Sequence, residues 1–536
     1  MKNNNIKNKL SKYFNKEVLD NINFFEINKN KDLISSIFEK IHNKEERKKY
    51  AQFFTHKELV NFILNHIPIK KTDSILDPAC GAGAFLIEAY EKVSLNNIYG
   101  IDIDKKALDL CSINLEYKIG KSSFNLKQAN TLKTNLRSLF PKIAKQNGFD
   151  IVIGNPPFQN LLKNIDYKEE EIYTKVLSGI ANSATLMIAK GYEFLKEGGF
   201  MGFVLPKNIA RVDSFKTLRK FLIENTKIMY IYDLDHYFKD VRGDQMIMIF
   251  QKKKLTSKEI LKNKVKILIF RKGNKFTDPY NYEIPQTLFN QYNFFPIFYH
   301  ENIFKLANKL LSEKNTLEKL CEGKIFRGLG ISTKSDSFVT EKINGACISY
   351  RGDSIKRFGI KYQLFLKQNI VDKLPKNEIK RLNVEKIILQ NLCSKEGGIF
   401  ATICSDNEFT LDTVTNIITN KIELKYLLGV LNSKLANFFL IFIIFLNSNF
   451  TMHTDKQYIG KIPIMLPNKK QKNKVISIVD RIMKIKDNYS KEFFELYDKL
   501  NNHIFEIYHL DKKEIGIINK LLLEVMSKKQ NGISNE

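Results

Sequence analysis

The residues best suited to chemistry stand in one tetrapeptide, Asn155-Pro156-Pro157-Phe158. Its two prolines fix the backbone and remove two amide donors, which leaves the Asn155 side-chain oxygen and the Pro156 carbonyl as acceptors. Two such acceptors can bind both N–H bonds of an exocyclic amino group, such as that of adenine, whose lone pair is otherwise delocalised into the ring. A nitrogen held near tetrahedral geometry can attack an electrophile. Phe158 offers a flat face on which an extruded base can stack.

A glycine-containing turn lies upstream, in residues 77–85 with the sequence DPACGAGAF. Gly81 and Gly83 allow the backbone to turn sharply and a ligand to approach it closely. Asp102 ends the next apolar segment, where a carboxylate can accept hydrogen bonds from ribose hydroxyls. The dinucleotide fingerprint requires a third glycine where this chain has Leu86. The turn therefore indicates a nucleotide-like ligand, and taken alone it also fits a tight turn without a ligand.

The surrounding elements explain how these residues would be positioned. Helices are expected at 85–93, 105–115 and 185–195, and short apolar strands at 74–76, 97–103, 124–129, 149–153, 200–205, 230–234 and 246–250. This alternation predicts an α/β fold with a doubly wound, mostly parallel sheet. Residues 77–85, Asp102 and Asn155 each follow a strand, and such sheets bind ligands at the carboxyl ends of their strands.

With these motifs in this order, the sequence resembles the S-adenosylmethionine-dependent DNA amino-methyltransferases, specifically the adenine methylases of restriction–modification type. NPPF resembles their catalytic motif and DPACGAGAF their first cofactor motif. Residues 51–55, AQFFT, resemble the upstream motif that holds the methionine end of the cofactor. The order of motifs matches the subgroup with the cofactor motifs first, the catalytic motif next and a target-recognition domain last.

The resemblance implies roles for individual residues. Asn155, Pro156 and Phe158 would form the catalytic motif, and Phe158 and Phe238 would stack against the flipped base. No metal site is implied. The residues that the resemblance assigns to S-adenosyl-L-methionine are Phe54, Thr55, Asp77, Ala79, Gly81, Gly83, Asp102, Ile103, Asn130 and Asn155.

Two positions depart from the family pattern. The upstream motif usually begins with Gly and ends with Pro, whereas this chain has Ala51 and His56 there. The third cofactor motif usually supplies an Asp to the amino group of the cofactor's adenine, and Asn130 stands at the matching position. An Asn carbonyl can accept the same hydrogen bond without charge assistance.

The charge balance indicates a polyanionic partner. The 536 residues include 86 Lys+Arg and 58 Asp+Glu, a net charge of +28, and the excess is larger after residue 250. A Lys-rich genome would raise Lys throughout and explains only part of this excess. GKIFRGLGIST (323–333) and SYRGDSIKRFGIK (349–361) resemble segments of the family's target-recognition domain. We expect double-stranded DNA with a specific recognition sequence as partner, contacted by Arg327, Arg351 and Arg357. The alternative for each arginine is a solvated surface position.

Four regions are expected. Residues 1–48 form a helical lead-in, 49–254 the methyltransferase domain, 255–470 a mixed α+β target-recognition domain, and 471–536 a helical C-terminal segment, with long helices at 474–489 and 493–508. Since no nuclease signature stands out, we expect a solitary methylase, with a cognate restriction endonuclease as a separate partner where one exists.

The remaining features exclude several classes. Six cysteines without a CxxC pair predict neither a disulfide scaffold nor a zinc site. The polar N-terminus is not a secretory signal. The apolar run 438–446 is shorter than the about 20 residues that a membrane-spanning helix needs, which favours a buried helix and a cytoplasmic protein without a membrane partner.

Three other functions remain open on the sequence. The NPPF motif also occurs in enzymes that methylate protein glutamines, and an RNA methyltransferase fits the basic charge. The modification subunit of a multisubunit restriction complex shares the motif, but usually has a long helical N-terminal domain and no recognition domain of its own. A DNA-binding protein with an inactive methylase fold is disfavoured by the intact Asp77, Gly81, Gly83 and Asn155.

Overall fold

The chain divides into two compact units, residues 1–297 and 298–536, and each is described by itself. The structure is a computed structural model. It describes residues 2–14, 16–20, 32–34, 37, 55–121, 123–158, 170–177, 182–235, 244–271, 275–292, 294–331, 337–339, 346–449 and 451–526.

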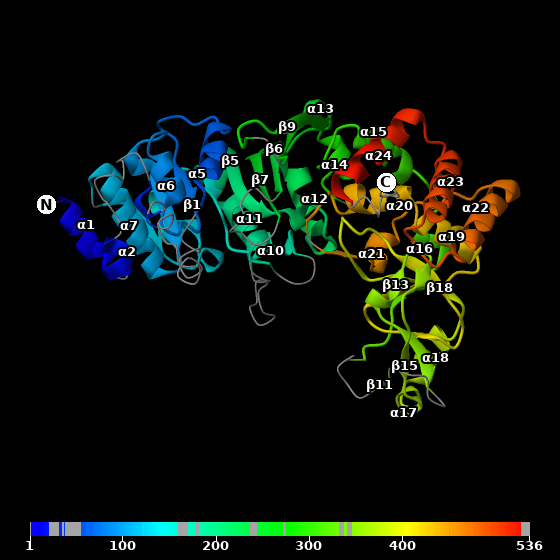
Figure 1. The fold of residues 1–536 in the computed structure, drawn as a ribbon. Coiled ribbons are helices and arrows are strands. Elements are labelled where there is room, and N and C mark those ends of the chain that lie inside the picture. Colours follow the sequence, from blue (N-terminus) through cyan, green and yellow to red (C-terminus); the bar gives the residue numbers. More distant parts are fainter. Residues whose placement is uncertain are drawn as a thin grey trace. The chain divides into compact units, whose positions relative to one another are not determined.

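A nine-stranded sheet forms the centre of the N-terminal unit, with the strand order β3-β2-β1-β4-β5-β7-β6-β8-β9 (Figure 1). Its strands are β1 (Ile75–Asp77), β2 (Ile98–Asp102), β3 (Asn125–Gln128), β4 (Phe149–Gly154), β5 (Leu195–Pro206), β6 (Thr226–Asp235), β7 (Gln245–Lys252), β8 (Lys264–Ile269) and β9 (Tyr280–Pro285).

The first five strands in this order are parallel, and β7 lies antiparallel to both β5 and β6. The central strands β1, β4 and β7 are apolar along nearly their whole length and buried, as strands covered on both faces must be. The mostly parallel α/β sheet expected from the alternation of strands and helices is therefore confirmed.

The helices of this unit flank the sheet in sequence order. They are α1 (Lys2–Leu10), α2 (Lys16–Asp20), α5 (Lys57–Asn65), α6 (Ala84–Ala89), α7 (Lys105–Ile119), α8 (Leu136–Leu139), α9 (Pro141–Ala144), α10 (Glu171–Thr174), α11 (Ser183–Phe194), α12 (Lys216–Asn225), α13 (Ser257–Lys262) and α14 (Thr287–Gln291), with 3₁₀ turns at Leu95–Asn97, Thr131–Lys133, Lys207–Ala210 and Asp213–Phe215.

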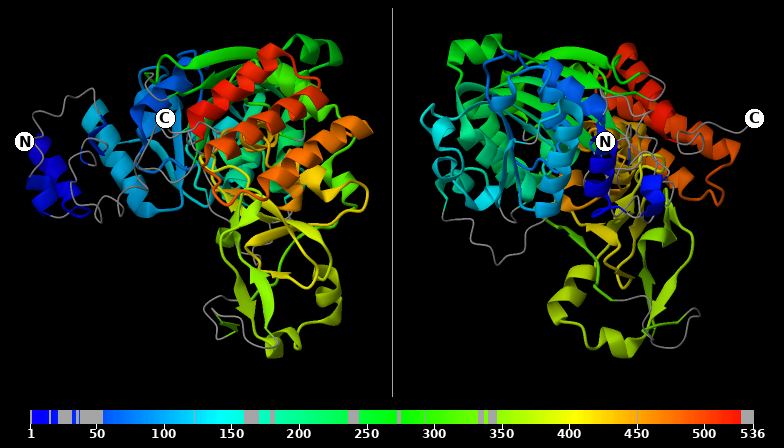
Figure 2. Two further views of the ribbon diagram at one scale, coloured as in Figure 1. Left: turned by 45° about the vertical axis from the view of Figure 1, so that its right-hand side comes forward. Right: turned by 90° about the vertical axis from the view of Figure 1, so that its left-hand side faces the viewer.

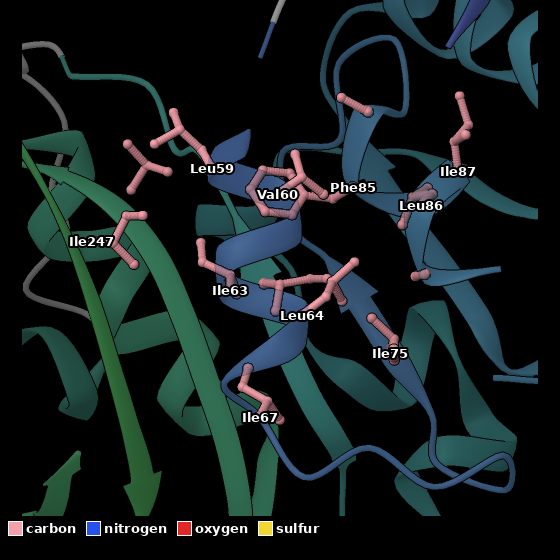
Figure 3. Close-up of a cluster of buried hydrophobic side chains, with 14 of the residues drawn as sticks. Leu59, Val60, Ile63, Leu64, Ile67, Ile75, Phe85, Leu86, Ile87 and Ile247 are labelled. Carbon is pink, nitrogen blue, oxygen red and sulfur yellow. The ribbon is translucent and has the colours of Figure 1, made fainter. Parts of the chain in front are cut away.

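Helix α5 lies at the centre of the core on one face of the sheet. Its apolar residues recur at helical spacing, which places Leu59, Val60, Ile63 and Leu64 on the buried side. Figure 3 shows these side chains between Ile247 of β7 on one side and β1 with α6 on the other. The close approach of α5 to β5 requires Gly202, where a Cβ would lie 2.4 Å from Ile63 Cγ2.

The described part of the lead-in packs against α7. Ile6 and Leu10 of α1 share a buried cluster with Leu110 and Ile113. The ammonium group of Lys9 also forms an ion pair with Glu116 at 2.7 Å. The lead-in therefore joins the N-terminal unit through an apolar face that is closed by charge pairing at its rim.

The structure differs from the expected boundary between residues 254 and 255. Strand β8 pairs in parallel with β6, and β9 pairs antiparallel with β8, so the same sheet continues to Pro285. The strands at 264–269 and 280–285 were missed because the pattern of residues after QKKK (251–254) is less regular. The compact unit extends to Ile297.

The C-terminal unit combines small sheets with helices. Its sheets have the orders β10-β20-β16-β18, β11-β15-β12-β19, β13-β14 and β17-β21. The strands are β10 (Ile325–Arg327), β11 (Phe338–Val339), β12 (Cys347–Tyr350), β13 (Ile355–Lys356), β14 (Gly359–Ile360), β15 (Leu364–Leu366), β16 (Lys386–Gln390), β17 (Leu392–Cys393), β18 (Ala401–Cys404), β19 (Phe409–Thr410), β20 (Val414–Ile417) and β21 (Met452–His453).

The C-terminal helices gather at one end of this unit, away from β11 and β15 (Figures 1 and 2). The two expected long helices are α22 (Lys469–Ile482) and α23 (Lys491–Ile507), and α24 was missed. The other helices are α15 (Ile303–Leu311), α16 (Leu317–Leu320), α17 (Gln368–Val371), α18 (Lys376–Leu382), α19 (Leu424–Leu431), α20 (Lys434–Phe438), α21 (Lys456–Ile459) and α24 (Lys512–Val525). The mixed α+β domain followed by helices is confirmed.

The apolar run 438–446 is buried. It starts at the end of α20 and continues as a π-helical segment, Phe439–Ile444, whose side chains are all buried. Among the described residues no single helix is long and apolar enough to cross a membrane. One pair, Leu424–Leu431 with Lys434–Ile444, passes such a test by length and composition only when its two helices, bent by 53°, are taken together.

Candidate active site

Three of the predicted site segments meet at one edge of the sheet. Asp77 is the last residue of β1, Asp102 ends β2, and Asn155 directly follows β4. Strands β2, β1 and β4 are neighbours and parallel, so their carboxyl ends lie side by side. The sheet thus brings together the glycine turn, the acidic strand end and the NPPF tetrapeptide.

The glycine turn is tied to the end of β2 by a hydrogen bond. The backbone N–H of Gly81 donates to Asp102 Oδ2 at 2.8 Å, and the N–H of Asp104 donates to Oδ1 at 2.9 Å. Both carboxylate oxygens retain lone pairs for further donors, such as ribose hydroxyls. Burial nevertheless raises the pKa of Asp102 above its usual value. The arrangement holds the Asp102 carboxylate in one orientation beside the turn.

Asp77 is the most buried ionisable group of the site, with a side chain that is 2% exposed. Its Oδ1 accepts from the N–H of Ala79 at 3.1 Å. Burial raises the pKa of Asp77 to about 8, and the nearby charge of Asp102 acts in the same direction. A cationic group placed against this carboxyl would offset the cost of ionising it, which fits an amino-acid ammonium as a ligand.

Gly83 serves the packing of the turn. Its φ of +88° lies in the left-handed region, and a Cβ would lie 2.6 Å from Cys111 Sγ of α7. We expected this glycine to leave room for a ligand, but the structure places a cysteine where its side chain would project. Gly83 therefore allows α6 to start close against α7.

An exposed apolar residue and an asparagine flank Asp102. Ile103 is 65% exposed, which is unusual for an isoleucine at the end of a central strand and leaves a surface for a flat ligand. Asn130 follows β3, and its Oδ1 accepts from the N–H of Leu132 at 3.1 Å. This bond fixes the Asn130 side chain, and the second lone pair of Oδ1 remains available to a ligand amino group.

The tetrapeptide 155–158 is held from behind. The Ser183 hydroxyl, at the start of α11, donates to the Pro157 carbonyl, while Pro156 is buried. Asn155 and Phe158 are half-buried, and within the described part of the chain the Asn155 amide group has no hydrogen-bond partner. An uncommitted amide on an anchored backbone can accept hydrogen bonds from a substrate without first losing bonds of its own.

Asn114 is a supporting residue that sequence reasoning missed. It is fully buried on α7, and its Nδ2 donates to the carbonyl of Ala82 at 3.0 Å and to Asp32 Oδ1 at 2.7 Å. Its Oδ1 accepts from the N–H of Leu33 at 2.9 Å. Asn114 thus links the glycine turn to the lead-in. A polar residue within the apolar face of the expected helix 105–115 was the available signal.

Some predicted residues cannot be placed. Phe54 and Phe238, expected to bind the cofactor and the base, lie outside the described residues, as do Ala51–Phe53. Thr55 is described and half-buried just before α5. No group of three or more His, Cys, Asp or Glu side chains suited to a metal ion occurs in the part of the chain that the structure describes.

The three arginines of the C-terminal unit have different environments. Arg327 forms a two-bond ion pair with Asp455, at 2.7 and 2.9 Å, and Arg351 pairs with Asp353. Arg357 is only 4% exposed, and its guanidinium lies 4.9 Å from the ring centre of Tyr497. The expectation that Arg357 contacts DNA is corrected, because its guanidinium packs inside the unit between the β13–β14 hairpin and α23.

The comparisons with known proteins agree with this site. Residues 29–292 match the family of N-6 DNA methylases, and residues 348–464 match the TaqI-like C-terminal specificity domain. The first region belongs to the N-6 DNA methylase family, and the second carries a specificity domain. The resemblance to adenine methylases of restriction–modification type is thereby confirmed.

Two curated relatives and one solved structure show the extent of the similarity. The chain is 27% identical to the putative type II restriction enzyme and methyltransferase RM.MjaORFECS2P of Methanocaldococcus jannaschii, over 68% of the chain and 30% of the relative. It is 25% identical to the type II methyltransferase M.VspI of Vibrio sp., over 38% of the chain and 49% of the relative. It therefore spans half or less of these relatives.

The type IIL restriction-modification enzyme MmeI, solved in complex with DNA, has a similar fold. Its TM-score is 0.61 at 13% identity, covering 94% of this chain and 81% of that one. At this identity the similarity supports the fold alone.

Proposed function

We propose that this protein is a site-specific DNA methyltransferase that transfers a methyl group from S-adenosyl-L-methionine to the exocyclic amino group of a flipped adenine in double-stranded DNA, as part of a restriction–modification or related defence system. The observation that carries the proposal is the uncommitted Asn155 amide on the anchored NPPF backbone, one strand away from Asp77. The family match and the specificity domain favour DNA as the substrate.

The described residues fit the cofactor at three points. The buried Asp77 carboxyl, beside the bare Cα of Gly154, suits the methionine ammonium, and the fixed Asp102 carboxylate suits the ribose hydroxyls. Ile103 and Asn130 flank the position for the adenine ring. Phe54, Thr55, Ala79, Gly81, Gly83 and Asn155 complete the proposed cofactor set. When bound, S-adenosyl-L-methionine supplies an electrophilic methyl group.

The chain's own residues prepare the nucleophile. The Asn155 side-chain oxygen and the Pro156 carbonyl accept the two N6–H bonds of the target adenine, which keeps the N6 lone pair out of the ring. Phe158 and Phe238 stack on the extruded base. N6 forms a bond to the methyl carbon as the methyl–sulfur bond breaks with its electron pair staying on sulfur, and N6 then loses one proton to water.

The proposal is tested by the identity of the methylated product. Purified protein is incubated with radiolabelled S-adenosyl-L-methionine and separately with duplex DNA, structured RNA or a bacterial release factor. We expect N6-methyladenine in DNA alone, at one recognition sequence. Label in RNA or in protein glutamine, with none in DNA, would transfer the proposal to one of the alternative substrates.

A further inference from the structure

A polar cluster in the C-terminal unit surrounds one arginine and leaves part of it free. The cluster consists of Arg327 at the end of β10, Asn391 after β16, Thr415 of β20, His453 of β21 and Asp455 at the start of α21. These segments are far apart in the sequence, and the two sheets bring their polar side chains together.

The cluster holds Arg327 by one edge. Its Nε and one Nη2 hydrogen donate to the two carboxylate oxygens of Asp455, at 2.7 and 2.9 Å. A paired geometry of this kind fixes the guanidinium plane. These hydrogen bonds also keep the pKa of Asp455 below its usual value, so the partner stays ionised.

Asp455 is fixed from inside the unit. Asn391, only 1% exposed, donates from Nδ2 to Asp455 Oδ1 at 3.0 Å and to Thr415 Oγ1 at 2.8 Å. Since a carboxylate only accepts, this orientation of Asn391 is determined, and its Oδ1 faces His453 Nδ1 at 3.3 Å. His453 Nδ1 is therefore the donor in that contact.

This assignment decides which hydrogens of Arg327 remain. Arg327 Nη2 lies 3.3 Å from His453 Nδ1, but a nitrogen that already carries a hydrogen for Asn391 cannot accept from Arg327. In the described part of the chain, Arg327 Nη1 has no hydrogen-bond partner either. The Nη1–Nη2 end of the guanidinium thus presents two parallel donors, on a side chain that is 46% exposed.

We propose that Arg327 reads a guanine of the recognition sequence with this free end, and that Asp455 is its positioning residue. Guanine O6 and N7 are two adjacent acceptors in the major groove, which match the two parallel donors of a fixed guanidinium. The Asp455 partner neutralises the charge that a phosphate contact would use, while it leaves the hydrogen-bond geometry intact. The inference rests on the proposed DNA methyltransferase function and adds a specificity residue to it.

The test is a base-analogue scan. The recognition sequence of the wild-type protein is read from methylated DNA, and each of its guanines is then replaced singly by 7-deazaguanine, which lacks the N7 acceptor. At one position we expect the wild-type methylation rate to fall about 10- to 100-fold, the value of a bidentate base contact. The Arg327→Ala protein should be slower on the normal site and insensitive to the analogue at that same position.

Three further variants sharpen the result. Arg327→Lys keeps the charge but cannot form two parallel bonds, so it should behave as Arg327→Ala, and it carries the test if the alanine variant fails to fold. Asp455→Asn should reduce the discrimination without abolishing binding. Arg481→Ala, an exposed arginine on α22, is the matched control and should keep the wild-type analogue profile.

Salt dependence separates base reading from a phosphate contact. Arg327→Ala should leave the slope of log affinity against log salt unchanged, whereas loss of a phosphate contact would reduce it by about one unit. A reduced slope, a site without guanine, or the same analogue profile in wild type and Arg327→Ala would overturn the inference and leave the methyltransferase proposal intact. Absence of DNA methylation by the wild type would overturn both.

Discussion

Asp77 and Gly154 touch across the carboxyl ends of β1 and β4, so that a Cβ at position 154 would lie 2.8 Å from Asp77 Oδ1. The missing side chain at Gly154 lets the buried carboxyl lie directly beside the start of the NPPF tetrapeptide. A cofactor bound by Asp77 and a base bound by Asn155 would consequently approach one another from neighbouring strands.

The raised pKa of Asp77 predicts pH-dependent cofactor binding. With burial raising this pKa to about 8, the ligand-free protein holds a proton that must leave when an ammonium binds. Affinity for S-adenosyl-L-methionine should rise by up to about tenfold per pH unit between pH 6 and 8. Calorimetry in buffers of different ionisation enthalpy should detect the released proton, and Asp77→Asn should remove both effects.

The same proton affects the stability of the ligand-free protein, with the opposite sign. The unfolded chain releases it above about pH 4 and the folded chain above about pH 8, so folding retains a proton across this window. The contribution of Asp77 to stability is present below pH 4 and is lost as the pH rises toward 8. Asp77→Asn should flatten that part of the pH–stability curve; an unchanged curve would contradict the assignment.

Gly83 is predicted to be a folding residue. Gly83→Ala places a Cβ against Cys111 Sγ at a φ of +88°, and we expect a loss of about 1–3 kcal/mol in the free energy of unfolding. Urea denaturation measures this loss. In the Cys111→Ala background the penalty should shrink to the backbone strain alone. An equal penalty in both backgrounds would show that the contact with Cys111 is not its cause.

Arg357 is predicted to stabilise the C-terminal unit. Its guanidinium is buried against Tyr497 and Phe400, and Arg357→Ala should lower the free energy of unfolding by about 2 kcal/mol. The salt dependence of DNA binding should remain that of the wild type, measured below the lowered melting temperature. A smaller salt slope with unchanged stability would restore this residue as a phosphate contact.

Phe158 should separate base capture from cofactor binding. Its half-buried ring beside Asn155 is expected to stack on the flipped base, which is worth about 1–3 kcal/mol. Phe158→Ala should give a smaller fluorescence rise from 2-aminopurine at the target position, with unchanged affinity for S-adenosyl-L-methionine. Phe158→Tyr is the conservative control and should retain the signal. An undiminished rise in the alanine variant would remove Phe158 from the base pocket.

The sequence predicted the chemistry-bearing turns better than their support. Residues 77–85 and Asn155 could be located because each follows a short apolar strand, and a parallel sheet gathers strand ends at one edge. The packing partner of Gly83 could not be predicted, since Cys111 reaches it only through the tertiary fold. In the cluster 351–357, alternating basic residues gave no indication that Arg357 is buried and Arg351 exposed. Strands β8 and β9 were missed because strand pairing after residue 254 leaves a weak local pattern.

The catalytic role of Asn155 is tested most directly by the turnover of Asn155→Ala on DNA that contains the recognition sequence. Removal of one oriented acceptor from a developing charge typically costs about 2.7–4 kcal/mol. We expect single-turnover methylation to fall at least about 10²- to 10³-fold, while the affinities for S-adenosyl-L-methionine and for the DNA remain within a few-fold of wild type. Full turnover in this variant, or loss of cofactor binding with an intact fold, would contradict the account.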